Sequence, residues 1–76
     1  MKELVEYIAK SLASNPDEVI VEEEEDDEGK VILKLTVAEE DKGKLIGREG
    51  RVAQAIRVLL RVAAVKAGTR VNLEIL

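Results

Sequence analysis

Two glycines, Gly47 and Gly50, stand immediately before the longest helical pattern in this 76-residue sequence. Apolar residues recur at helical spacing from Arg51 to Ala67, and Gly68 is a suitable C-cap. Residues 38–47 are compatible with one or two further helical turns, which acids at their start favour. The glycines therefore connect two helices, where they permit positive φ angles and close approach of the backbone to a ligand.

The remaining patterns predict one more helix and three strands. Residues 2–13 have an amphipathic helical stripe, which Asn15-Pro16-Asp17 ends because proline cannot donate a backbone hydrogen bond. Residues 18–22 and 31–37 are β-branched or alternating and are expected to pair antiparallel, and residues 70–75 alternate as a third strand. The order αββααβ predicts an α+β fold, with a three-stranded sheet packed on helices, as a single domain over residues 1–76.

The composition excludes most enzyme chemistry. The chain has no cysteine and no histidine, so thiol nucleophiles, imidazole bases, disulfides and zinc sites are not expected, and we expect neither a cofactor nor an enzyme. Its apolar runs are too short for a membrane span or a signal peptide, so the expected location is the cytoplasm. The absence of Phe, Trp, Cys and His is also compatible with a designed or simplified sequence.

Charge is divided unevenly along the chain. Residues 1–41 hold 4 basic and 14 acidic side chains, whereas residues 42–76 hold 8 basic and 2 acidic ones. The balances of −10 and +6 sum to the net charge of −4 and suggest a polyanion partner for one face. The seven acids from Glu22 to Glu28 are expected to form a solvated hairpin tip with Gly29 in the turn. A calcium loop is disfavoured because Leu35 occupies the position of its bidentate glutamate.

The segment from Gly43 to Arg51 has the properties of a phosphate-binding loop. Gly50 precedes a helix whose N-terminal N–H groups attract anions, and neighbouring basic side chains add charged donors. The glycine spacing matches neither a Walker A loop nor a dinucleotide fingerprint. The segment from Ile46 to Ile56 instead resembles the core pattern of KH domains, an aliphatic residue, G-x-x-G and following aliphatics. In KH domains that loop clamps about four nucleotides of RNA by their backbone.

The resemblance extends over nearly the whole chain. The opening Met-Lys-Glu-Leu-Val, the Asn-Pro-Asp-Glu-Val segment, the Gly43–Arg51 stretch and the final Val-Asn-Leu-Glu-Ile are similar to the small bacterial single-KH proteins of the KhpA (YlqC-like) family. This resemblance implies a type II KH domain that binds single-stranded RNA in the cytoplasm. It also implies an RNA chaperone linked to cell-envelope growth, which forms homodimers and pairs with a larger KH-containing protein of the KhpB (Jag) type.

The KH pattern assigns candidate RNA contacts around residues 47–50. Arg48 and Arg51 are expected at backbone phosphates with Lys44 on the same rim, and the less favoured alternative for each is ordinary surface charge. Gln54 could meet a base or a sugar, and Ile46 serves either a base-contacting surface, together with Thr36 and Val37, or the core. Glu49 opposes phosphate binding unless it points to solvent or pairs with an arginine. The full set is Lys44, Ile46, Gly47, Arg48, Glu49, Gly50, Arg51 and Gln54.

Two alternatives remain open at this stage. The long helix carries Val58, Val62 and Val65 beside its main apolar stripe of Val52, Ile56, Leu59, Leu60 and Ala63, so the second stripe contacts either a partner protein or the first helix. The chain could also be a KH-fold dimerisation adaptor with weak or no RNA binding, which its net acidity favours.

Overall fold

The computed structural model describes residues 1–76 and has the predicted αββααβ order. The helices are α1 (Lys2–Leu12), α2 (Lys42–Ile46) and α3 (Arg51–Ala67), and the strands are β1 (Ile20–Glu25), β2 (Val31–Thr36) and β3 (Val71–Ile75). Short 3-10 turns cover Pro16–Glu18, Glu39–Asp41 and Arg48–Gly50. The α+β prediction is confirmed, and α3 has the bounds that its apolar periodicity predicted.

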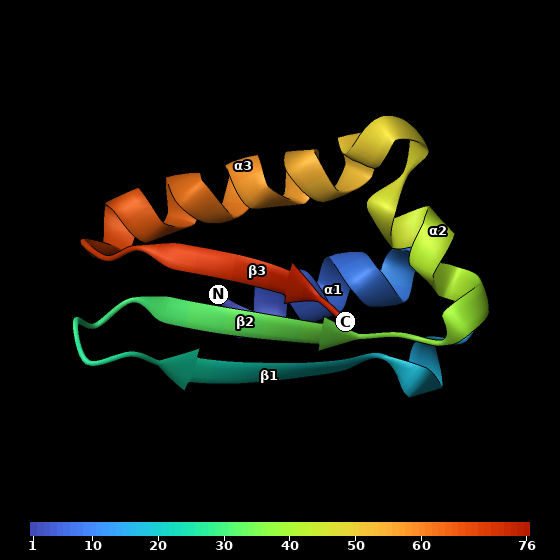
Figure 1. The fold of residues 1–76 in the computed structure, drawn as a ribbon, viewed down its shortest axis with the longest axis horizontal. Helices are drawn as coiled ribbons and strands as arrows, with labels where there is room; N and C mark the ends of the chain where they lie inside the picture. Colours follow the sequence, from blue (N-terminus) through green and yellow to red (C-terminus); the bar gives the residue numbers. More distant parts are fainter.

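The three strands form one mixed sheet in the order β1-β2-β3. β1 and β2 pair antiparallel, as predicted, with Val21 opposite Leu35, whereas β3 runs parallel to β2 with Leu73 opposite Leu33. The parallel pair is possible because α2 and α3 carry the chain back to the end of the sheet where β2 begins (Figure 1). β3 is therefore an edge strand, and α3 lies beside it.

The helices pack on one face of the sheet around an aliphatic core (Figure 1). The fully buried side chains include Leu33 and Leu35 of β2, Leu45 of α2 and Leu60 of α3. A large buried leucine therefore anchors each of α2 and α3 in the core. The core cluster also contains Val5, Ala9, Val19, Val21, Val37, Ile56 and Leu73. None of the helices is long and apolar enough to cross a membrane.

The buried face of α3 differs from the predicted one. Ala53, Ile56, Leu60 and Ala64 are buried, whereas Leu59, which we placed with the core, is 53% exposed. Small alanines let the helix approach the sheet closely, so the buried stripe is shifted away from Leu59. A helical stripe predicted mainly from large apolar residues does not show this shift, because Ala53 and Ala64 contribute little hydrophobicity.

The acidic run is partly strand rather than wholly a hairpin tip. β1 continues through Glu25, and the turn begins only at Asp26. The Asp26 Oδ1 atom accepts the backbone N–H groups of Glu28 and Lys30 at 2.9 and 2.8 Å, and Gly29 has a φ of 83°. The bond from Lys30 is the main cause that lowers the pKa of Asp26. The turn therefore closes on an aspartate, with its glycine where we predicted it.

Candidate nucleic-acid interface

The loop between α2 and α3 has an uncommon backbone conformation. Gly47, Glu49 and Gly50 have φ angles of 77°, 56° and 74°, so three of the four residues from 47 to 50 adopt positive φ. A β-carbon on Gly47 would lie 2.8 Å from the backbone nitrogen of Val52. Gly47 is thus required by both its angle and its contact, whereas Glu49 adopts a left-handed conformation that costs a non-glycine residue about 1 kcal/mol.

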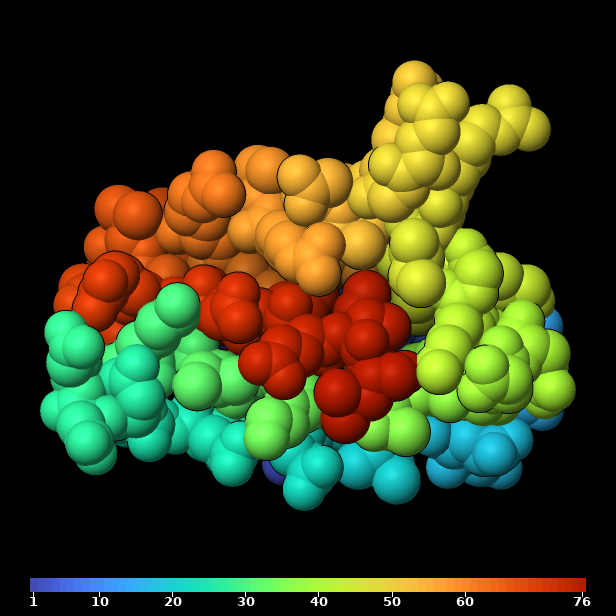
Figure 2. All heavy atoms as spheres, in the orientation of Figure 1, coloured from blue at the N-terminus to red at the C-terminus, as the bar shows by residue number.

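This loop stands out from the body of the protein. In Figure 2 the yellow segment around residue 50 rises above the rest of the surface, and the side chains of Arg48, Glu49 and Arg51 are exposed. Leu45 is fully buried at one end of the loop and Ala53 is buried at the other, so both ends are fixed. No side chain caps the N-terminus of α3 at Gly50. Its N–H groups and the helix dipole can therefore act on an external anion.

The loop charges are arranged so that the one acid is paired. The Arg51 Nη2 atom lies 3.6 Å from Glu49 Oε2, and both side chains are mostly exposed. Arg48 has no ion pair within 4 Å. An exposed pair of this kind is worth about 0.2–1 kcal/mol, so a phosphate can displace Glu49 from Arg51 at small cost. The loop thus offers one free and one weakly paired guanidinium.

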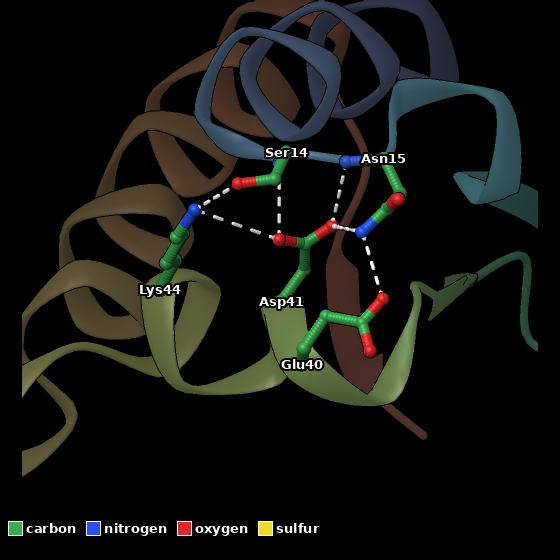
Figure 3. Close-up of polar contacts among 5 residues, drawn as sticks. All are labelled: Ser14, Asn15, Glu40, Asp41 and Lys44. Carbon is green, nitrogen blue, oxygen red and sulfur yellow. Dashed lines mark hydrogen bonds and ion pairs between the residues drawn. The ribbon is translucent and has the colours of Figure 1, made fainter.

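Lys44 lies one helical turn before the loop but has a structural contact as well. Its ammonium donates a hydrogen bond to Ser14 Oγ and lies 3.7 Å from Asp41 Oδ1 (Figure 3). The side chain is half exposed, so the contact leaves part of the ammonium accessible. This contact could not be predicted from the local pattern, because Ser14 is 30 residues away.

Asp41 supports the loop from within the fold, and it was not among the predicted site residues. Its side chain is fully buried, and its carboxylate accepts the backbone N–H groups of Ser14 and Asn15 at 2.9 Å each (Figure 3). The bond from Ser14 is the main cause that lowers the pKa of Asp41. Through these bonds Asp41 holds the start of α2 against the end of α1, and α2 leads directly into Gly47. A signal for it was the helix start at residues 38–42, where we considered the acids only as a group.

Three further candidates can be placed relative to the loop. Ile46 is 40% exposed and lies outside the buried core, next to Gly47. Val37 belongs to the core and is buried, so it cannot contribute to a base-contacting surface as we considered. Gln54 is exposed on the first turns of α3, where its Oε1 atom accepts a hydrogen bond from Arg57 at 3.3 Å.

Below the loop, a pocket of about 90 Å³ lies between α3 and the edge strand β3. Its polar lining comes from Arg57, Arg61 and Asn72, which were not among the predicted site residues. The Arg57 Nη2 atom donates to the carbonyl oxygen of Leu73 at 3.3 Å. Arg57 and Arg61 share one face of α3 with Gln54, and that spacing of three and four residues was a signal available in the sequence.

The backbone of β3 also faces this pocket. The Arg70 carbonyl accepts the N–H of Val31, and the N–H of Leu76 donates to Leu35, so even-numbered residues of this segment bond to β2. Because peptide groups alternate along a strand, Val71, Leu73 and Ile75 direct their N–H and C=O groups to the free edge. An extended ligand lying between α3 and β3 would therefore meet unpaired backbone donors.

The acidic side chains do not converge on a metal site. No group of three or more acidic side chains is arranged to hold a metal ion. Along β1 the acids lie on an exposed strand, where Glu24 forms an ion pair with Lys34 of β2 at 2.7 Å. These residues thus form a solvated sheet surface.

The fold and the loop together define a KH domain of the type II order, in which a G-x-x-G segment joins two helices beside a mixed three-stranded sheet. The family model described as "KhpA/KhpB, KH domain" matches residues 2–75. The chain therefore belongs to the KhpA/KhpB KH-domain family.

Individual relatives agree with that assignment along the full chain. The chain is 53% identical over 76 residues to a protein of Clostridium acetobutylicum named RNA-binding protein KhpA, with all of both chains covered. A protein of the same name from Borreliella burgdorferi is 50% identical over 74 residues, covering 97% of this chain and 89% of the relative. Among solved structures, a crystal structure of Era from Aquifex aeolicus matches 97% of this chain with a TM-score of 0.60 and 25% identity. The chain spans only 28% of that protein.

Proposed function

We propose that this protein binds single-stranded RNA without enzymatic activity, and that the loop of residues 47–50 grips the RNA backbone. The observation that carries the proposal is the projecting loop with three positive φ angles at the uncapped N-terminus of α3. Backbone N–H groups and the helix dipole there favour a phosphate. The relatives named RNA-binding protein KhpA support the same function.

Each loop residue has a role in this proposal. Gly47 lets the loop turn against Val52, and Gly50 starts α3 without a side chain in the path of the ligand. Arg48 and Arg51 contact phosphates, since both are exposed and neither is held by a strong pair. Glu49 weakens binding while it competes for Arg51, and its cost is limited because that pair is solvent-exposed.

The residues around the loop complete the grip. Lys44 contributes the exposed part of its ammonium to the rim, while Ser14 and Asp41 fix its position. Ile46 offers an exposed aliphatic surface to a base, and Gln54 offers an amide to a base or sugar. Bases then extend toward β3, whose free edge supplies backbone hydrogen bonds. This arrangement needs no aromatic platform, in agreement with a chain whose only aromatic residue is a tyrosine in α1.

Sedimentation of the purified chain with and without a short single-stranded RNA tests this function. An RNA-binding protein sediments faster with RNA, and the shift disappears as salt is raised because phosphate contacts release counterions. A dimerisation adaptor would show the same sedimentation in both samples. That second result would reject RNA binding and favour the adaptor.

We further propose that α3 mediates association with a second KH domain. Val58, Leu59, Val62 and Val65 form an exposed apolar stripe on this helix, and Val65 is 72% exposed. Helix α1 does not cover them, which removes the intramolecular alternative considered from the sequence. The partner is a second copy of the chain or a larger KH-containing protein of the KhpB type. As the KhpA resemblance implies, the complex would act as a cytoplasmic RNA chaperone in cell-envelope growth.

A further inference from the structure

A second pocket lies at the far end of α3, remote from the glycine loop. It has a volume of about 310 Å³, against about 90 Å³ for the pocket nearer the loop. Three basic side chains line it, Lys30 after the β1–β2 turn, Arg61 of α3 and Arg70 before β3. Three separate segments of an acidic protein thus bring cations to one cavity.

Backbone contacts fix the positions of these three segments. The Thr69 hydroxyl donates to the carbonyl oxygen of Gly29 at 3.0 Å, and the Val31 N–H donates to the carbonyl oxygen of Arg70 at 2.9 Å. These bonds hold the chain segments that contain Lys30 and Arg70 side by side. The cavity is therefore framed by the fold and does not depend on one mobile loop.

The charge of this pocket is only partly neutralised, by the exposed carboxylates of Asp26 and Glu28 in the neighbouring turn. Lys30 and Arg61 have no ion pair within 4 Å, and Arg70 lies 3.8 Å from Glu28, with both side chains mostly exposed. An exposed pair at that distance contributes little and is easily exchanged for another anion. Three cations around one cavity would repel one another, so an anion bound between them relieves that repulsion.

The two pockets are continuous along the side of α3. Both are lined by Arg61 of the helix and Val71 of the edge strand. Gln54, Arg57 and Arg61 follow one face of α3 from the loop toward the second pocket, and ten residues of helix between Arg51 and Arg61 correspond to about 15 Å. A polar track therefore leads from the candidate phosphate loop to the three cations.

We propose that the pocket of Lys30, Arg61 and Arg70 is a second phosphate subsite, which binds the backbone of an RNA chain that continues past the nucleotides at the glycine loop. This inference rests on the proposed function. It adds that the RNA footprint is longer than the stretch of about four nucleotides held by a G-x-x-G loop. Guanidinium and ammonium groups favour phosphate oxygens through charge-assisted hydrogen bonds. The exposed carboxylate of Glu28 leaves Arg70 when the phosphate binds.

The test compares RNA length with the loss of two of the cations. The wild-type chain and the double variant Lys30→Gln/Arg70→Gln, whose two residues line only the second pocket, are titrated with labelled oligouridylates of four and eight nucleotides. Binding of the shorter one is followed by NMR shifts. An octamer can bind one site in more positions than a tetramer can. The ratio of wild-type to variant affinity at each length does not depend on that number of positions. We expect a ratio near one for the tetramer and about tenfold for the octamer, because each of the two lost contacts is solvent-exposed and therefore weak. The slope of log K against log salt for the octamer should fall by about 1.4.

A matched control removes the same charge elsewhere. Lys10→Gln/Lys66→Gln also loses two positive charges, at exposed sites outside both pockets, and should leave both ratios near one. Equal ratios for tetramer and octamer in the Lys30/Arg70 variant would overturn the subsite. So would binding of an acidic peptide that the variant abolishes while octamer affinity stays unchanged, because the pocket would then serve a protein.

Failure of the proposed function gives a different result. If neither oligonucleotide binds the wild-type chain at any salt concentration, RNA binding itself is rejected and the subsite with it. If the tetramer binds and the octamer gains nothing from Lys30 and Arg70, only the subsite is rejected. The two lengths thus separate the two claims.

Discussion

Gly47 and Val52 are in such close contact that a β-carbon on Gly47 would lie 2.8 Å from both the Cβ and the backbone nitrogen of Val52. Gly47 also has a φ of 77°, so the loop enters α3 along a path that only glycine can follow without displacement. The pair fixes the turn between α2 and α3. It therefore sets where the N-terminus of α3 and the arginines on either side of it are presented.

Gly47→Ala should both destabilise the protein and weaken RNA binding. The positive φ alone costs about 1–3 kcal/mol, and displacement of Val52 adds to it. Urea unfolding measures the free energy, and fluorescence anisotropy measures RNA affinity. Gly43→Ala is the matched control, because Gly43 is helical with open space around its Cα. Alanine there should stabilise the chain by about 0.5–1 kcal/mol and leave affinity unchanged. Equal behaviour of the two variants would contradict the steric role of Gly47.

Glu49→Gln should strengthen RNA binding. The change removes the carboxylate that lies 3.6 Å from Arg51 Nη2 and so frees that guanidinium for phosphate. We expect a gain of about threefold to tenfold in affinity at low salt, which shrinks as ionic strength rises. Glu74→Gln on β3 changes the net charge equally and lies away from the loop, so its smaller effect reports the general electrostatic contribution. A loss of affinity in Glu49→Gln would show that the carboxylate contributes to binding.

Asp41→Asn should destabilise the fold and reduce its sensitivity to acid. The folded-state pKa of Asp41 is lowered from its ordinary value, mainly by the Ser14 N–H, so its contribution to stability is complete above the unfolded pKa of about 3.9. That contribution is lost as pH falls through the lower folded pKa. Urea unfolding between pH 7 and pH 2 should therefore give the variant a lower free energy of unfolding at pH 7 and a shallower decline in acid.

Glu40→Gln is the control for Asp41, since Glu40 contacts only the Asn15 side chain at the surface. It should change the free energy of unfolding far less. Identical acid limbs for wild type and Asp41→Asn would remove Asp41 as the residue that couples α1 to α2.

Much of the fold was predictable because aliphatic periodicity and local turn and capping residues determine it. α3 has the predicted bounds, the β1–β2 hairpin is antiparallel, and Gly68 is the C-cap with a φ of 73°. The parallel pairing of β3 was not predicted, since periodicity says nothing of strand direction. β1 begins two residues later than expected and extends into the acidic run, because Pro16–Glu18 forms a turn and pairing with β2 outweighs the low strand propensity of glutamate.

The candidate site was predictable in its local part only. The positive φ angles at Gly47 and Gly50 follow from a glycine pattern within one segment. The contact between Asp41 and Ser14 joins residues 27 apart, and the pocket of Lys30, Arg61 and Arg70 joins three elements. Such sites depend on tertiary packing, which a single sequence does not display. The prediction that Leu59 packs with the core was wrong for a related reason. Buried alanines determine which face of α3 lies against the sheet.

Val62→Glu should prevent association through α3 without unfolding the chain. Val62 is half exposed, so a charge there is solvated in the monomer but would be buried in a helix-mediated contact. Sedimentation equilibrium should show a dimer for the wild type and a monomer for the variant, with matching circular dichroism spectra. Ser11→Glu adds the same charge to an exposed position of α1 and should leave the dimer intact. A wild-type chain that stays monomeric at high concentration would reject self-association through α3.

The most direct test is the RNA affinity of Arg48→Asp/Glu49→Asp. Aspartate tolerates the left-handed conformation at residue 49 and leaves Gly47 and Gly50 in place, so the backbone of the loop should persist. Lys66→Glu, at the other end of α3, makes the same change in net charge and is the control. We predict unchanged circular dichroism for both variants, loss of RNA retention in the loop variant alone, and near wild-type affinity in the control. RNA binding by the loop variant at wild-type affinity would contradict the account.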